Sequence, residues 1–297
     1  MRNSAVFISL LILLSCASKP ARPITRALIN NAKYTPQQSV TSDPVQLMNG
    51  RWDGPSDTGF SHPYVSIMPD FTVYGDIDGD GGNEGVVIVL ESGGGSGIYG
   101  VLALFARADK EALHLGSIPL GDRTQIRSVR IQPGQLIAEY VRQAENEPRC
   151  CPTEVAQSVW TYANGKFSSK SDKILGRLSP EFLKDKQWTL QPPTQPAVTL
   201  TYVDGRFVGS TGCNQYSAAV KNGEYGGAIL VQAANTTPGT CDPKTSDSDF
   251  DFLKRLQHAT RMGFRPDLLW MSYDLGGDKD SGTLEFKETS KTTSSQP

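Results

Sequence analysis

The densest group of chemically active residues in the chain is an acidic, glycine-rich segment from Gly75 to Glu84. Three aspartates stand at alternate positions, with a glycine at the sixth position of the run. Ca²⁺ takes about six to eight oxygen ligands at once, and this spacing can wrap a short loop around one ion. We therefore expect a candidate calcium site whose ligands are Asp76, Asp78, Asp80, the Gly82 carbonyl and Glu84.

The acidic segment is not an EF-hand, because Val87 stands where that motif requires an acid. It resembles the DxDGDGxxD loops of integrin-type repeats, with Glu84 in place of the final aspartate. The alternative interpretation is an acidic turn of similar shape that holds no metal. The apolar run Gly85–Leu90 follows directly, so the loop is expected to lead into a strand.

The first sixteen residues have the pattern of a lipoprotein leader. Arg2 is positive, and the apolar run from Ala5 to Leu14 would reach about 15 Å as a helix, half of a hydrocarbon core. Such a run is typical of a signal peptide. The segment Leu13-Leu14-Ser15-Cys16 resembles the lipobox of bacterial lipoproteins, which implies cleavage before Cys16 and acylation of that residue. Ala17 resembles the sorting pattern of Gram-negative outer-membrane lipoproteins. The alternative is an ordinary leader with an incidental cysteine.

The other residues that could take part in catalysis do not form a known catalytic motif. His62, His114 and His258 are isolated, and none lies in a Gly-x-Ser-x-Gly or His-Glu-x-x-His context. Gly209-Ser-Thr-Gly212 has the composition of a nucleophile elbow, but no helix is expected after it. The glycine-rich run Glu91–Gly97 lacks the Lys-Ser/Thr of a phosphate-binding loop. Adjacent Cys150 and Cys151 can form a vicinal disulfide, remain reduced or pair separately, and no Cys-x-x-Cys spacing indicates a redox centre.

The amino-acid composition indicates which class of fold must position these residues. The chain has 297 residues with 29 Lys+Arg against 31 Asp+Glu, so its net charge of −2 gives no drive towards nucleic acid. Charged residues at 20% and hydrophobic residues at 38% exclude a disordered chain and a polytopic membrane protein. With 29 Gly and 19 Pro, short strands are favoured over long helices.

We predict a mainly β fold with few helices (α+β), organised as two β-rich domains. Turn formers such as Pro133-Gly134 and Asn164-Gly165 separate the expected strands. A short helix is expected after Ser179, and a longer one from Ser248 to Arg261. The predicted order is a signal peptide (1–15), a lipidated N-terminus and tether (16–43), a β-rich domain with the acidic loop (44–170), a connector (171–187), a second β-domain (188–288) and a disordered tail (289–297).

The second segment carries a specific family resemblance. Its motifs are Trp188-Thr-Leu, the run Leu200–Ser217 with its Gly-Cys-Asn-x-Tyr core, Thr236–Cys241, Phe252-Leu253 and Gly282–Phe286, in that order. This succession resembles the META domain, the module of the HslJ-type heat-inducible lipoproteins. The resemblance implies a small antiparallel β-domain with one helix, located in the envelope and associated with stress or motility, without catalytic residues. The usual Thr-Arg-Met-Ala-Cys run is replaced here by Thr-Thr-Pro-Gly-Thr-Cys.

Two cysteines of this META-like segment are expected to pair. Cys213 and Cys241 would lie in an oxidising compartment, where a disulfide between them would stabilise the fold by about 3–4 kcal/mol. The alternative is a pair of buried free thiols. In the first segment, Gly94-Gly-Ser-Gly97, Leu120-Gly-Asp-Arg123 and Cys150-Cys151-Pro152 resemble parts of a recurrent uncharacterised domain of bacterial lipoproteins.

These observations predict a non-enzymatic outer-membrane lipoprotein that faces the periplasm. We expect it to contribute to envelope maintenance or stress resistance through protein or envelope contacts. Its expected partners are the membrane, through the lipid on Cys16, and an unidentified envelope protein, with no nucleic acid. The alternative is a periplasmic β-domain protein that binds a ligand or inhibits a protease.

Overall fold

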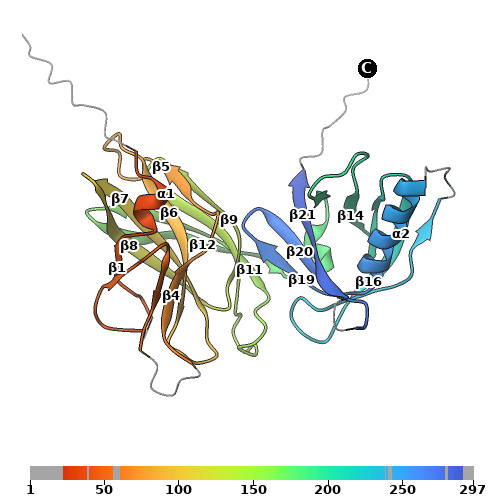
Figure 1. Ribbon diagram of the computed structural model, residues 1–297, viewed down its shortest axis with the longest axis horizontal. Helices are drawn as coiled ribbons and strands as arrows, with labels where there is room; N and C mark the ends of the chain where they lie inside the picture. Colours follow the sequence, from red (N-terminus) through yellow and green to blue (C-terminus); the bar gives the residue numbers. More distant parts are fainter. Residues whose placement is uncertain are drawn as a thin grey trace, which may run out of the picture.

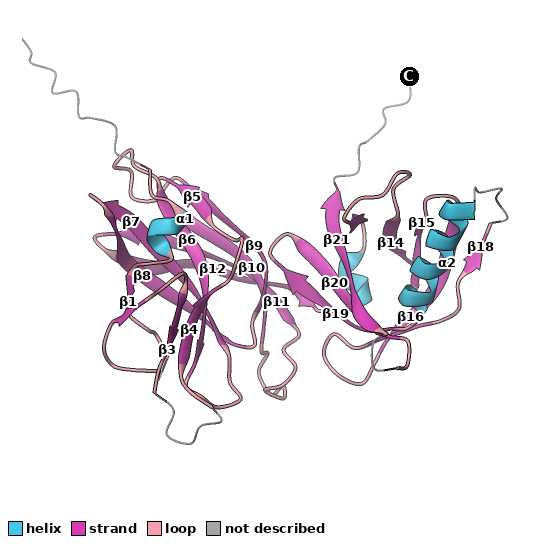
Figure 2. Cartoon of the chain, viewed as in Figure 1, coloured by secondary structure: helices cyan, strands magenta, loops and turns pink. Residues whose placement is uncertain are grey.

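The computed structural model describes residues 23–38, 40–55, 61–237, 239, 243–277 and 280–289. The described chain is mainly β, with antiparallel strand pairing throughout (Figures 1 and 2). Its helices are α1 (Arg26–Ile29), the 3-10 helix η1 (Pro180–Leu183) and α2 (Pro243–Gln257). This architecture confirms the mainly β fold predicted from the sequence. In the part of the chain described here, no helix is both long and apolar enough to cross a membrane.

The N-terminal half, residues 23–177, contains two large sheets that pack face to face and a small two-stranded one. The first sheet comprises β3 (Arg51–Asp53), β4 (Tyr64–Ile67), β6 (Glu84–Ser92), β7 (Tyr99–Ala108) and β8 (Glu111–Asp122) in spatial order, with β5 (Val73–Gly75) paired to β6. The second comprises β12 (Lys166–Arg177), β11 (Glu154–Ala163), β10 (Gln135–Arg142) and β9 (Gln125–Gln132). Ile88 and Leu102 of the first sheet share a core with Leu136 and Tyr140 of the second.

The opposite face of the first sheet is covered by the N-terminal segment. This segment contains α1 and the paired strands β1 (Lys33–Tyr34) and β2 (Val45–Gln46). Ile29 and Tyr34, both fully buried, belong to one apolar cluster with Val87 and Val101. Strand β6 is buried on both faces, which explains its nearly continuous apolar sequence. The predicted tether, 16–43, is therefore wrong from Ile24 onward, because the sheet needs these residues to cover its apolar outer face.

The C-terminal half, residues 180–289, is a nearly closed antiparallel barrel. Its strands are β13 (Gln187–Gln191), β14 (Thr199–Val203), β15 (Arg206–Ser210), β16 (Gln215–Asn222), β17 (Ile229–Val231), β18 (Asn235–Thr236), β19 (Ala259–Arg265), β20 (Leu268–Asp274) and β21 (Ser281–Thr289). The spatial order is β17-β16-β15-β14-β13-β21-β20-β19, and a bridge between Ala228 and Arg261 brings its two edges together. Helix α2 packs Phe252 against Tyr216 and Phe286, with ring centroids 5.6 and 6.5 Å apart.

Two predicted boundaries differ from the structure. The helix predicted over Ser248–Arg261 begins earlier, at Pro243, and ends at Gln257. Residues from Ala259 onward form β19, since pairing with β20 buries Met262 and Phe264 in the barrel. The predicted connector 171–187 is also shorter, because β12 stays paired to β11 as far as Arg177 before η1 begins.

The two halves are in direct contact. Val141 and Val155 of the N-terminal half belong to the same apolar cluster as the barrel core. The Phe264 amide donates to Gln125 Oε1 at 2.9 Å, and the Asp267 amide donates to the Arg127 carbonyl at 2.8 Å. The halves therefore share packing along β9 and β19, and their division into two independent domains stays a prediction.

Candidate functional site

The acidic loop predicted from the sequence forms the tip of a β-hairpin. Strands β5 and β6 pair from Val73 to Gly75, and the last pair joins Gly75 to Glu84. Glu84 is thus the first residue of β6, and residues 76–83 form the connection. Ile77 is fully buried in the core between the two sheets, so the loop is fastened to the body of the protein.

Backbone turns and side-chain hydrogen bonds determine the shape of the loop. Gly79 and Gly81 have φ of +81° and +86°, a backbone conformation that residues other than glycine rarely adopt. Asp76 Oδ1 accepts a hydrogen bond from the Gly79 amide at 2.7 Å, and Asp76 Oδ2 accepts one from the Gly81 amide at 3.1 Å. The loop is therefore held by its first aspartate, as Asx-type turns are.

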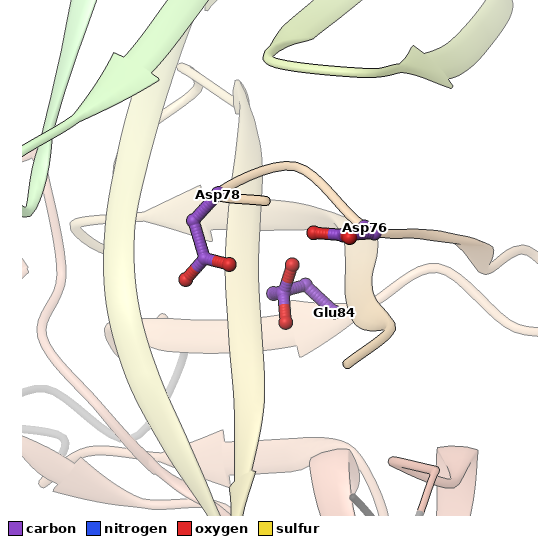
Figure 3. A group of neighbouring side chains, drawn as sticks. All are labelled: Asp76, Asp78 and Glu84. Atoms are coloured by element: carbon purple, nitrogen blue, oxygen red, sulfur yellow. The ribbon is translucent and has the colours of Figure 1, made fainter. Parts of the chain in front are cut away.

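Three of the predicted ligands come together. One carboxylate oxygen from each of Asp76, Asp78 and Glu84 lies within 4.8 Å of the other two. Figure 3 shows these three side chains grouped at the loop. Asp80 does not belong to this group, and its Oδ1 accepts a hydrogen bond from the Gly82 amide at 2.6 Å. The expectation that Asp80 is a ligand is therefore not met, because its carboxylate turns back to close the loop.

Glu84 has the most unusual electrostatic environment of the three. Its side chain belongs to a residue only 3% exposed, and its Oε2 accepts a hydrogen bond from the Ile77 amide at 3.0 Å. Burial raises the pKa of Glu84, the Ile77 amide opposes this, and the three neighbouring aspartates raise it further. A hard cation would relieve both the burial cost and the repulsion. The donor set of carboxylate oxygens therefore fits Ca²⁺.

The cysteines lie in separate places. Cys150 and Cys151 form a vicinal disulfide in the loop between β10 and β11. This loop is held by Glu147, which accepts a hydrogen bond from the Thr153 amide at 3.0 Å. Cys213 is disulfide-bonded. Its predicted partner, Cys241, and the predicted lipidation site, Cys16, lie outside the described residues.

One side-chain pair was not expected from the sequence. His114 Nε2 lies 2.8 Å from Ser117 Oγ, because a bulge at Leu115 brings both onto one face of β8. The Thr35 amide donates to His114 Nδ1 at 3.4 Å, so the ring hydrogen is assigned to Nε2 and is donated to the serine. Activation of a serine nucleophile needs transfer in the opposite direction. Burial also lowers the pKa of His114 to about 4.

The Gly-Cys-Asn motif forms a tight turn that contacts α2. Gly212 has φ +105°, and a side chain there would lie 3.2 Å from the Pro196 carbonyl oxygen. Thr211 and Asn214 exchange hydrogen bonds across the turn, with the Thr211 amide donating to the Asn214 carbonyl at 2.9 Å. The Asn214 side-chain amide donates to Asp249 Oδ2 at 3.0 Å. The motif thus joins the barrel to its helix.

The barrel, its single helix and this turn agree with a match to a known family model. Residues 183–291 match the model described as META domain. The match begins at the end of η1 and includes α2 and β13 to β21. The C-terminal part of the chain is therefore a META domain, which confirms the resemblance predicted from its motifs. No curated protein and no solved structure matches the chain. The resemblance of the N-terminal half stays a prediction.

Proposed function

We propose that this protein is an outer-membrane lipoprotein of a Gram-negative envelope, held by acyl chains on Cys16, with its folded part in the periplasm. Its role is to maintain the envelope or its stress resistance through contacts with another envelope protein, without catalysis. The observation that carries the proposal is the lipobox-like Leu13-Leu14-Ser15-Cys16 at the end of an apolar leader, in a chain that bears a META domain. The alternative, a ligand-binding or protease-inhibitory β-domain, stays a prediction.

The lipid anchor is tested by metabolic labelling. The wild-type protein, expressed in a Gram-negative host, is expected to incorporate radiolabelled palmitate, and Cys16→Ala is expected to lose the label because the acylated atom is gone. The matched control is the Cys150→Ala, Cys151→Ala double variant, which keeps Cys16 and should remain labelled. Equal labelling of the wild type and Cys16→Ala at equal expression would end the lipoprotein proposal.

We further propose that the hairpin loop holds Ca²⁺ through Asp76, Asp78 and Glu84, as a structural ion rather than a catalytic one. Ca²⁺ at about 100 times its dissociation constant should stabilise the fold by about 2.7 kcal/mol, and hence raise the melting temperature by several degrees. The measurement is thermal unfolding with Ca²⁺ and with chelator. Glu84→Gln should lose the response, whereas Asp80→Asn should keep it, since Asp80 lies outside the carboxylate cluster.

The rise in melting temperature that Ca²⁺ causes should depend on pH. Because burial raises the pKa of Glu84 above its ordinary 4.5, the metal-free folded protein holds this proton to higher pH than the unfolded chain does. In the metal-free protein, the contribution of Glu84 to the free energy of unfolding therefore falls as pH rises through the raised pKa. Ca²⁺ binds the ionised carboxylate, so the gain from Ca²⁺ should grow over the same range. Identical melts with Ca²⁺ and chelator at every pH would remove the ion from the proposal.

A further inference from the structure

A groove lies between the N-terminal segment and strand β8. It has a volume of about 750 Å³ and is bordered by α1 on one side and by residues 110–114 on the other. Leu28 and Ala112 are among its apolar lining, and Leu113 beside them is 54% exposed. Lys33 and Lys110 line the same groove and are exposed. The groove is therefore lined by apolar side chains together with two exposed cations.

The groove begins where the described chain begins. The Pro23 carbonyl accepts a hydrogen bond from Arg107 Nη1 at 3.0 Å, Ile24 is 3% exposed, and Thr25 already lines the groove. Seven peptide units separate Pro23 from Cys16, and a chain of that length spans at most about 25 Å. A lipid on Cys16 would therefore keep this end of the folded body close to the bilayer surface, instead of at the end of a long tether.

The charges of the groove suit an anionic surface. Glu111 is the one carboxylate among its described lining residues, against the two lysines. Burial lowers the pKa of His114 to about 4, so this lining residue is neutral at pH 7. A lysine close to an anionic bilayer contributes about 1 kcal/mol, roughly a fivefold factor in association. Glu111 offsets one of the two lysines, so the lining as a whole corresponds to roughly fivefold.

We infer that this groove docks on an anionic membrane surface, with lipid phosphate between Lys33 and Lys110 and with Leu113 entering the interface. The inference rests on the lipid anchor proposed above and adds an orientation to it. Helices α1 and α2 lie toward opposite ends of the long axis of the molecule (Figure 1). A membrane contact at α1 therefore presents the META domain away from the bilayer, where a periplasmic partner can reach it.

The test uses the full-length lipidated protein in phosphatidylcholine vesicles with and without phosphatidylglycerol. Amide hydrogen exchange of residues 26–34 and 110–114 is expected to slow on the anionic vesicles, by roughly fivefold. The Lys33→Glu, Lys110→Glu variant should lose this protection and still carry palmitate. The matched control is Lys170→Glu, Lys173→Glu, which changes two exposed lysines on β12 and should keep the protection.

The outcomes separate the two proposals. If palmitate is incorporated but exchange is the same on neutral and anionic vesicles, the groove does not dock on the membrane, although the anchor stands. Protection that survives the Lys33→Glu, Lys110→Glu change would also overturn the role of the groove. If Cys16 carries no palmitate, the anchor and the membrane contact both fail.

Discussion

Replacing Glu91 by alanine is expected to lower the free energy of unfolding by about 3–5 kcal/mol. The Glu91 side chain is fully buried. Its Oε1 accepts a hydrogen bond from the Tyr34 hydroxyl at 2.5 Å, and its Oε2 accepts one from the Gln38 amide at 2.7 Å, with the Gln37 amide at 3.0 Å from both oxygens. Alanine would leave the buried Tyr34 hydroxyl without this acceptor and would remove the acceptor of the Gln37 and Gln38 amides.

The effect should be concentrated in the N-terminal segment. Glu91 lies on β6, and the three donors named above lie between residues 34 and 38, so this carboxylate fastens the segment to the sheet. Urea unfolding measures the loss in stability, and amide exchange of residues 33–38 should accelerate. Glu111→Ala, an exposed change on β8, is the control and should cost no more than about 0.5 kcal/mol. An equal effect of both variants would mean that the segment is not held by this contact.

Replacing Arg127 by alanine is expected to cost about 3–5 kcal/mol, because it leaves a buried carboxylate without its cation. Arg127 is only 14% exposed and pairs with Glu139, which is equally buried, and with Glu288 at 2.5 Å. Its guanidinium also lies 5.7 Å from the ring centroids of Phe182 and Phe264. These partners come from β10, β21, η1 and β19, so one side chain of the N-terminal half contacts three elements of the C-terminal half.

The control for this variant is Arg265→Ala on β19. Arg265 pairs with Glu285 at 2.6 Å, but its side chain is 57% exposed, so its loss should cost about 0–1 kcal/mol. The measurement is urea unfolding, followed by amide exchange at Phe264, whose amide is bonded to Gln125 across the junction. If Arg127→Ala costs no more than Arg265→Ala, the buried ion pairs do not hold the halves together.

The hairpin loop shows which structural features can be predicted from the local sequence alone. Alternate aspartates and glycines predicted the turn and the grouping of carboxylates that could bind a metal ion. An Asx turn and a positive φ are set by a few neighbouring residues, so they can be predicted locally. Glu84 was predicted as the last residue of the loop, before a strand from Gly85, and in the structure it is the first residue of β6. The separation of Asp80 from the other carboxylates was missed, since its Oδ1 accepts a hydrogen bond from the Gly82 amide instead of joining the cluster.

The N-terminal segment shows what the sequence alone could not indicate. Its polar composition predicted a tether, because Ile24, Ile29 and Tyr34 are too widely spaced to form a periodic apolar face. They are buried because they pack on a second apolar face of the first sheet, which no other element of the described chain covers. The number of faces that a sheet must bury is a property of the assembled fold.

The sequence by itself determined the β-rich class, most of the strands, the META domain and the acidic hairpin, since each depends on local periodicity, turn residues or a short motif. Tertiary structure alone decided the burial of Ile24, Ile29 and Tyr34, the contact of His114 with Ser117 and the position of Arg127 between the halves. The partners of Arg127 lie at residues 139, 182, 264 and 288, far apart along the chain. Contacts of that kind arise only when sheets have packed, because burial and electrostatic pairing act through space.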